Sequence, residues 1–205
     1  GNFGVVTSTH WIASAVGMSI LEKNGNAFDA AVATGFALQV VEPHLNGPGG
    51  EVPLILCPNE ESPIVICGQG VAPNSATLKT FSDMNLNIVP GSGLLPAVVP
   101  GAFDAWMLLL HNYGTMSLRT VLEPAISIAT KGYPLVPNII NTIKSVEELF
   151  KTEWTSSAEI YLPKGVLPSI GDFFTNKNMA KTYLRIIDEA ENKSKDRKEQ
   201  IKHAR

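Results

Sequence analysis

The sequence is poor in cysteine, in charge and in long hydrophobic runs. Only 2 of its 205 residues are cysteine, which excludes the disulfide framework of small secreted domains. Charged residues make up 17% of the chain and the net charge is -3, so neither a nucleic acid nor a membrane is expected as a partner. The main apolar segment, residues 27–41, is too short and small-sided for a convincing membrane span. The length suits one soluble domain, or a large part of one.

Residues that usually hold metals are also sparse and scattered. The four histidines show no ligand spacing: His10, His44, His111 and His203. We therefore expect no metal site and no cofactor. The chain starts Gly1-Asn2-Phe3, without methionine and without a signal peptide in view, which leaves both a cytoplasmic and a secreted location open.

Two helices are predicted near the start of the chain. The first runs from about Trp11 to Lys23, and Gly25 suits a left-handed position after its end. The second runs from Ala27 to Val41, with Asn26 as its N-cap and Asp29 in its first turn. Since this second helix is apolar nearly all round, we expect it to be buried.

Turn-forming residues follow at once, in the stretch Val41-Glu42-Pro43-His44-Leu45-Asn46-Gly47-Pro48-Gly49-Gly50. Its prolines restrict the backbone, and its glycines permit conformations and close approaches that a Cβ would block. The loop can present backbone N–H groups to a ligand or a neighbouring chain. A tight helix-to-strand connection without chemistry is an equally open alternative. His44 could serve such a site, although a structural, hydrogen-bonded histidine is the favoured interpretation.

Two short apolar runs, Leu54–Cys57 and Ile64–Cys67, predict a β-hairpin. Neither run alternates with polar residues, which predicts strands covered on both faces. Symmetric pairing puts Cys67 opposite Pro53 and separates the two thiols by about 13 Å along the ladder, beyond disulfide reach. We expect two reduced, buried thiols, and a third strand at 4–8.

The rest of the chain is predicted to be mainly helical. Helices are expected at 102–113, at 118–131 with Ser117 as N-cap, at 138–150 and at 179–190. The charged segment 191–205 is typical of a solvated helix or a frayed end. This divides the chain into a helix pair, glycine-rich loop and core strands (1–73), a mainly helical part (74–190) and a charged tail (191–205).

Four motifs in a fixed order resemble the large subunit of the γ-glutamyltranspeptidase family. They are Gly25-Asn26-Ala27-Phe28-Asp29-Ala30-Ala31-Val32-Ala33, then Val41-Glu42-Pro43-His44 with Gly47-Pro48-Gly49-Gly50, then Val99-Pro100-Gly101, and finally Leu122-Glu123-Pro124-Ala125-Ile126 leading to Ala129 and Gly132. The resemblance implies an α+β fold, the four-layer αββα sandwich of N-terminal-nucleophile hydrolases, incomplete in this chain.

The resemblance also implies a proenzyme that cuts itself into a large and a small subunit. In that family, a threonine at the start of the small subunit attacks a γ-glutamyl amide, and its own α-amine acts as the base. Thr7, Ser8 and Thr9 lie inside this chain without a free amine. We therefore expect no catalytic residue here, with the small subunit as partner and a γ-glutamyl (glutathione-type) or related amide as substrate.

One departure from the family bears on the substrate. Where the resemblance implies an arginine that pairs with the substrate α-carboxylate, this chain has Gln69, in Cys67-Gly68-Gln69-Gly70-Val71-Ala72-Pro73. Glutamine donates hydrogen bonds but carries no charge, and losing a charge-assisted bond costs roughly 1.5–3 kcal/mol. Gln69 is thus the candidate substrate-binding residue, or else a turn residue with no ligand. The alternatives for the whole protein are an amide hydrolase similar to the glutaryl or cephalosporin acylases, and a catalytically silent scaffold.

Overall fold

The computed structural model describes residues 2–59 and 61–205. It divides into two compact units, one formed by 1–47 with 107–205 and the other by 48–106. Each unit is described by itself.

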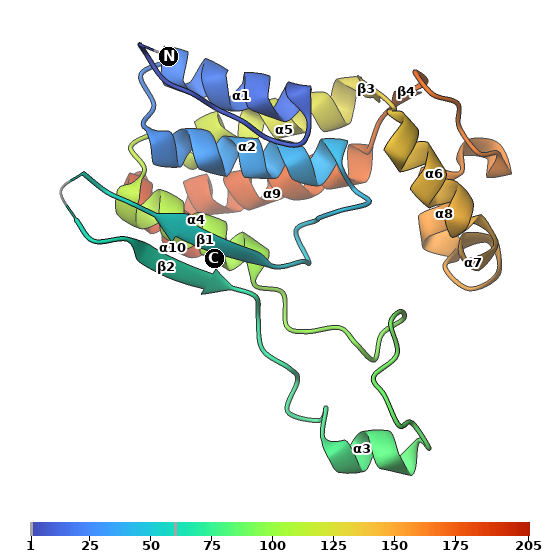
Figure 1. The fold of residues 1–205 in the computed structure, drawn as a ribbon. Helices are drawn as coiled ribbons and strands as arrows, with labels where there is room; N and C mark the ends of the chain where they lie inside the picture. Colours follow the sequence, from blue (N-terminus) through green and yellow to red (C-terminus); the bar gives the residue numbers. More distant parts are fainter. Residues whose placement is uncertain (1, 60) are drawn as a thin grey trace. The chain divides into compact units, whose positions relative to one another are not determined.

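The first unit is a set of packed helices (Figure 1). Helix α1 (Trp11–Glu22) lies on α2 (Ala27–Val41), α2 on α5 (Leu118–Lys131), and α5 on α9 (Lys177–Lys193). The predicted bounds of α1, α2 and α5 hold to within a residue. As expected from its composition, α2 is buried around most of its surface. The largest fully buried side chains of this unit come from helices and from the segments between them: Ile20, Phe36, Met107, Leu110, Leu118, Leu122, Tyr133, Ile139, Leu162, Tyr183, Ile187 and Ile201.

A buried aspartate joins the start of α2 to a distant loop. Asn26 caps α2 and Asp29 closes a capping box, as predicted. The Asp29 carboxylate is fully buried and also accepts hydrogen bonds from Thr115 and from the Met116 N–H. The prediction for Gly25 is wrong, because Asn24 takes the left-handed conformation with φ 67°. Gly25 is instead needed for space, since a Cβ there would lie 2.6 Å from the Ile20 side chain.

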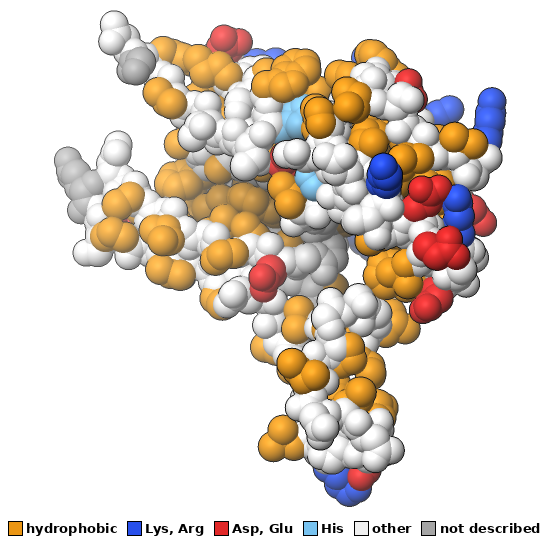
Figure 2. Space-filling model, turned by 45° about the vertical axis from the view of Figure 1, so that its right-hand side comes forward, with side chains coloured by type: hydrophobic (Ala, Val, Ile, Leu, Met, Phe, Trp, Pro, Cys, Tyr) orange, Lys and Arg blue, Asp and Glu red, His pale blue; other side chains and the backbone are white. Residues whose placement is uncertain are grey.

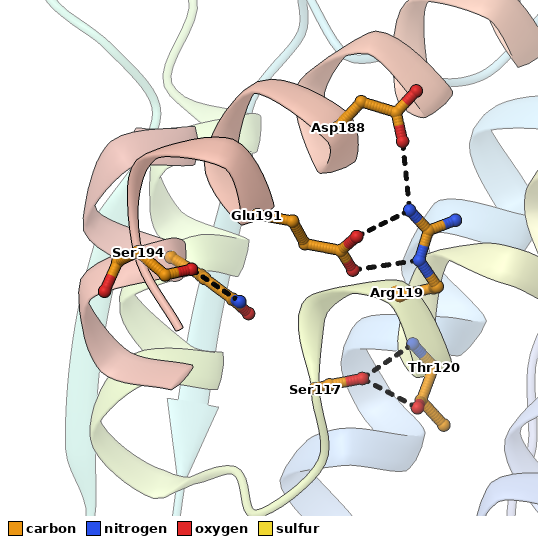
Figure 3. A network of polar contacts seen from close by, with 7 residues as sticks. Ser117, Arg119, Thr120, Asp188, Glu191 and Ser194 are labelled. Atoms are coloured by element: carbon orange, nitrogen blue, oxygen red, sulfur yellow. Dashed lines mark hydrogen bonds and ion pairs between the residues drawn. The ribbon is translucent and has the colours of Figure 1, made fainter. Parts of the chain in front are cut away.

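The segment 191–205 is more ordered than its charge pattern predicted. Helix α9 continues to Lys193, and α10 (Arg197–Ala204) packs against α9 and α5. Figure 3 shows Arg119 of α5 bonded to Asp188 and Glu191 of α9. The expectation of a helix is confirmed, and most of α10 is exposed or half-buried, whereas the alternative of a frayed end is wrong because Ile201 is fully buried.

The segment 133–175 is built from short elements. The helix predicted at 138–150 is broken at Val146 into α6 (Pro137–Ser145) and α7 (Glu147–Thr152). Helix α8 (Thr155–Tyr161) and a 3₁₀ turn, η1 (Pro163–Gly165), follow. Strands β3 (Tyr133–Pro134) and β4 (Phe173–Phe174) form a small antiparallel pair. The strand predicted at 4–8 is absent, since these residues pair with neither described sheet.

The second unit contains the predicted hairpin. Strands β1 (Val52–Leu56) and β2 (Ile64–Gly68) pair antiparallel, with Pro53 opposite Cys67 as expected. Helix α3 (Leu78–Asp83) follows, and α4 (Ala102–Tyr113) begins here.

One face of this hairpin is uncovered, contrary to the prediction. Burial alternates along both strands, and Ile55 and Val65 are 80% and 67% exposed. Figure 2 shows hydrophobic side chains, coloured orange, at the surface of the molecule. Cys57 and Cys67 are free thiols as expected, but both are exposed, because Cys67 lies on the uncovered face and Cys57 lies just beyond the end of β1.

Candidate functional site

Gln69 follows β2 at a point where three segments of backbone meet. Two residues after Gln69, the Val71 carbonyl accepts a hydrogen bond from the Val99 N–H at 2.9 Å. The N–H groups of Gly101 and Ala102 both donate to the Gly50 carbonyl, at 3.2 and 3.0 Å. These hydrogen bonds hold the end of the glycine-rich loop beside the start of α4.

Glycine is required at this crossing. Gly70 has φ +75°, and a Cβ on it would overlap the Val99 carbonyl oxygen. A Cβ on Gly101 would lie 2.5 Å from the carbonyl oxygen of Gly68, itself a glycine for which a Cβ would overlap the β1 backbone. The main chain on both sides of Gln69 is therefore held by direct backbone contact.

The Gln69 side chain is exposed and lies on the uncovered face of the hairpin. Its amide oxygen accepts a hydrogen bond from the Cys67 thiol, with Sγ and Oε1 3.7 Å apart. No described residue accepts a hydrogen bond from its NH₂ group. Sequence reasoning missed the Cys67 contact, although side chains two residues apart on a strand share a face.

The second unit offers little positive charge. Within 48–106 the only lysine or arginine is Lys79, which lies in α3 and pairs with Asp83 at 2.7 Å. An anionic group held by Gln69 would thus find no free cation within this unit.

The turn after α2 is built by local hydrogen bonds. The Glu42 carbonyl accepts from Leu45 N–H and from Asn46, and its carboxylate accepts from the Thr9 hydroxyl. Neither Gly47 nor Gly49 has a left-handed φ, and no described atom lies within 4 Å of the place a Cβ would take. No contact within the described residues therefore explains glycine at these two positions.

His44 lies in this turn and lines a small apolar cavity together with residues of α6 to α8: Ile139, Thr142, Ile143, Phe150 and Tyr161. Its Nδ1 is buried and has no hydrogen-bond partner among the described residues. The expected hydrogen bond of a structural histidine is therefore missing at this atom.

His10 is 3% exposed and caps α1, because its Nδ1 accepts from the Ile12 N–H at 3.2 Å. Its Nε2 is buried without a described partner. Burial lowers the pKa of His10, the nearby His44 lowers it further, and Glu42 opposes both effects. Its role is structural.

Two of the remaining candidates make local hydrogen bonds. The Ser8 hydroxyl donates to the His10 carbonyl, and His111 bonds its neighbour Asn112. His203 lies in α10. Within residues 2–59 and 61–205, no three His, Cys, Asp or Glu side chains gather as a metal would require. No helix in these ranges has the length and apolar character needed to cross a membrane.

Comparison with known proteins agrees with the motif order. The family model described as gamma-glutamyltranspeptidase matches residues 13–194. The glutathione hydrolase-like YwrD proenzyme of Bacillus subtilis (strain 168) is 36% identical over 192 residues, which are 92% of this chain and 36% of that protein. The acylase ACY 1 proenzyme of Pseudomonas sp. (strain SE83) is 36% identical over 157 residues, 70% of this chain and 27% of that protein. The chain thus spans about a third of the length of these relatives.

Solved structures agree on the fold. A structure of LmbA2991HD has a TM-score of 0.97 at 51% identity, over 100% of this chain and 35% of that one. The Helicobacter pylori γ-glutamyltranspeptidase has a TM-score of 0.83 at 34% identity, over 90% of this chain and 54% of that one. These matches confirm the expected α+β fold of N-terminal-nucleophile hydrolases, of which this chain forms a part. The chain belongs to the γ-glutamyltranspeptidase family.

Proposed function

We propose that this chain is the large-subunit portion of a self-processing amide hydrolase or acyl transferase, with Gln69 at the acyl group of the substrate. The observation that carries this proposal is the position of Gln69, an exposed polar side chain on a backbone crossing fixed by Gly70 and Gly101. A side chain carried by backbone that is held in this way is suited to contact a substrate at a defined place.

The nucleophile is proposed to come from a segment beyond Arg205. Thr7 and Ser8 are internal, and the Thr9 hydroxyl is bonded to Glu42. By the logic of the family, an N-terminal threonine of the small subunit would attack the amide carbonyl. Its α-amine, which titrates near neutrality, would take the hydroxyl proton and give it to the departing amine as the amide C–N bond breaks. The acyl group would then be held as an ester of the threonine and pass to water or to an amine.

The small subunit is also the proposed cover for the hairpin. Its uncovered face carries Ile55 and Val65, a cross-strand pair of large apolar side chains. Together with the fact that the chain spans 36% of its Bacillus relative, this supports a partner supplied by the same proenzyme.

Two substrate classes are proposed. The first is γ-glutamyl amides of the glutathione type, by membership of the family. The second is side-chain amides with an uncharged group in place of the α-carboxylate, such as 4-carbamoylbutanoyl amides, the neutral amide analogues of glutaryl compounds. Two observations favour this second class: Gln69 is neutral, and the only cation of its unit is paired with Asp83.

Hydrolysis of a γ-glutamyl anilide and a 4-carbamoylbutanoyl anilide, which lacks the α-carboxylate, by the full-length, processed enzyme tests both. We expect Gln69→Arg to raise the preference for the γ-glutamyl compound, measured as a ratio of kcat/KM values, by about ten- to a hundredfold. Asn74→Arg adds the same charge to an exposed position of the same unit, and should leave the ratio within about twofold of wild type.

An unchanged ratio in Gln69→Arg would mean that Gln69 does not face the ligand. A proenzyme that neither cleaves itself nor hydrolyses either anilide would support the third candidate, a catalytically silent scaffold.

A further inference from the structure

The main chain around Gln69 is fixed, but its side chain is not. Gly68 and Gly70 lie against the backbones of β1 and of Val99, so closely that a Cβ on either residue would overlap a carbonyl oxygen. The direction of the Gln69 amide therefore depends on what its side chain touches.

Its only described hydrogen-bond partner is Cys67. The two side chains lie on the same uncovered face, with Sγ 3.7 Å from Oε1. A thiol can donate one proton, and the amide oxygen can only accept. This contact turns the oxygen of Gln69 toward Cys67 and leaves its two N–H donors pointing elsewhere.

These two N–H donors determine which substrate groups the Gln69 side chain can bind. They suit a hydrogen-bond acceptor, and within 48–106 no unpaired lysine or arginine adds a preference for negative charge. A neutral carbonyl or hydroxyl oxygen on the acyl group can then be bound without the cation that a carboxylate needs.

We propose that Cys67 is a positioning residue, which holds the Gln69 amide with its NH₂ group toward an uncharged acceptor on the acyl group of the substrate. This rests on the proposed function. Cys67 acts through Gln69, and it shapes substrate binding rather than the bond-breaking step.

Kinetics of the processed enzyme with the 4-carbamoylbutanoyl anilide, whose acyl group ends in an uncharged carbonyl acceptor, provide one test. Cys67→Ala should raise KM about threefold with little change in kcat. The weak hydrogen bond that this variant lacks contributes to substrate binding and not to the bond-breaking step. Cys67→Ser keeps a donor and should restore KM. Cys57→Ala removes the other exposed thiol and should match wild type. Equal KM values for Cys67→Ala and Cys57→Ala would overturn the proposal.

Crystal structures of the processed wild-type enzyme and of Cys67→Ala provide a second test that needs no activity. The Gln69 side-chain amide should lie against Sγ in the wild type and should shift or lose order in the variant. An unchanged Gln69 side chain would overturn the proposal. Loss of hydrolysis of both anilides in the wild type would instead count against the proposed function alone, since the structural comparison still decides the role of Cys67.

Discussion

At the scale of single residues, His10 links the stability of the first unit to pH. It caps α1 through an Nδ1 lone pair, which only an imidazole unprotonated at that atom can offer. Burial lowers its pKa below the ordinary 6.5. Between the folded and the unfolded pKa, the unfolded chain binds more protons than the folded one, so the free energy of unfolding must fall as pH drops below about 6.5.

His10→Asn should therefore flatten this pH dependence. Asparagine is a good N-cap, so the hydrogen bond to Ile12 is retained while the titrating group is removed. Urea unfolding of the full-length protein at about pH 7.5 and pH 5.5 should show a smaller loss of stability in the variant than in wild type. His203→Asn changes a histidine of α10 and should lose as much stability at low pH as the wild type does. An equal loss in all three proteins would contradict the role of His10 in this pH dependence.

Several residues could be placed from local patterns in the sequence. Contacts between residues far apart in the sequence could not be predicted in this way. The cap formed by Asn26 and Asp29 was predicted because both partners lie within one helical turn. The bonds from Asp29 to Thr115 and Met116 join residues 86 and 87 positions apart, and no local pattern reports them. Gln69 was found by resemblance, whereas its contact with Cys67 needed the side-chain geometry of β2.

At the scale of elements, α10 shows how one apolar residue can fix a charged helix. Ile201 is the fully buried residue of this helix, and Arg197 adds hydrogen bonds to the carbonyls of Leu110 and Met116 at 2.7 and 2.6 Å. Helices α2 and α5 were predicted closely because each has a side-chain N-cap and a strong apolar pattern, all round in α2 and along one stripe in α5. In α10 a single isoleucine among charged neighbours gives no periodic signal, so its packing was missed.

Ile201→Ala should destabilise the protein by about 2–4 kcal/mol, since it removes a fully buried branched side chain and leaves a cavity. Leu184→Ala on α9 is the control, because Leu184 is 37% exposed and should cost about 1 kcal/mol or less. Chemical unfolding of the full-length protein measures both. Equal, small effects would show that α10 does not pack through Ile201.

At the scale of the whole molecule, the hairpin has an apolar face that the described residues of this chain leave uncovered. The sequence predicted strands covered on both faces from their unbroken apolar runs, but the described residues cover only one. A one-sided hairpin normally alternates apolar and polar residues, and here both faces are apolar. The composition of the strands therefore fits a sheet that is buried in the complete protein, as the fold of the family requires.

Placing a charge on this face tests that interpretation. Ile55→Lys in the full-length proenzyme should impair self-cleavage and assembly of the two subunits, because a buried, unpaired ammonium group is strongly unfavourable. Ser62→Lys adds the same charge to the exposed turn of the same hairpin and should mature normally. Gel analysis of cleavage and size-exclusion chromatography report both steps. If the two variants mature equally well, the Ile55 face is open to solvent in the complete protein, and the proposed small subunit does not cover it.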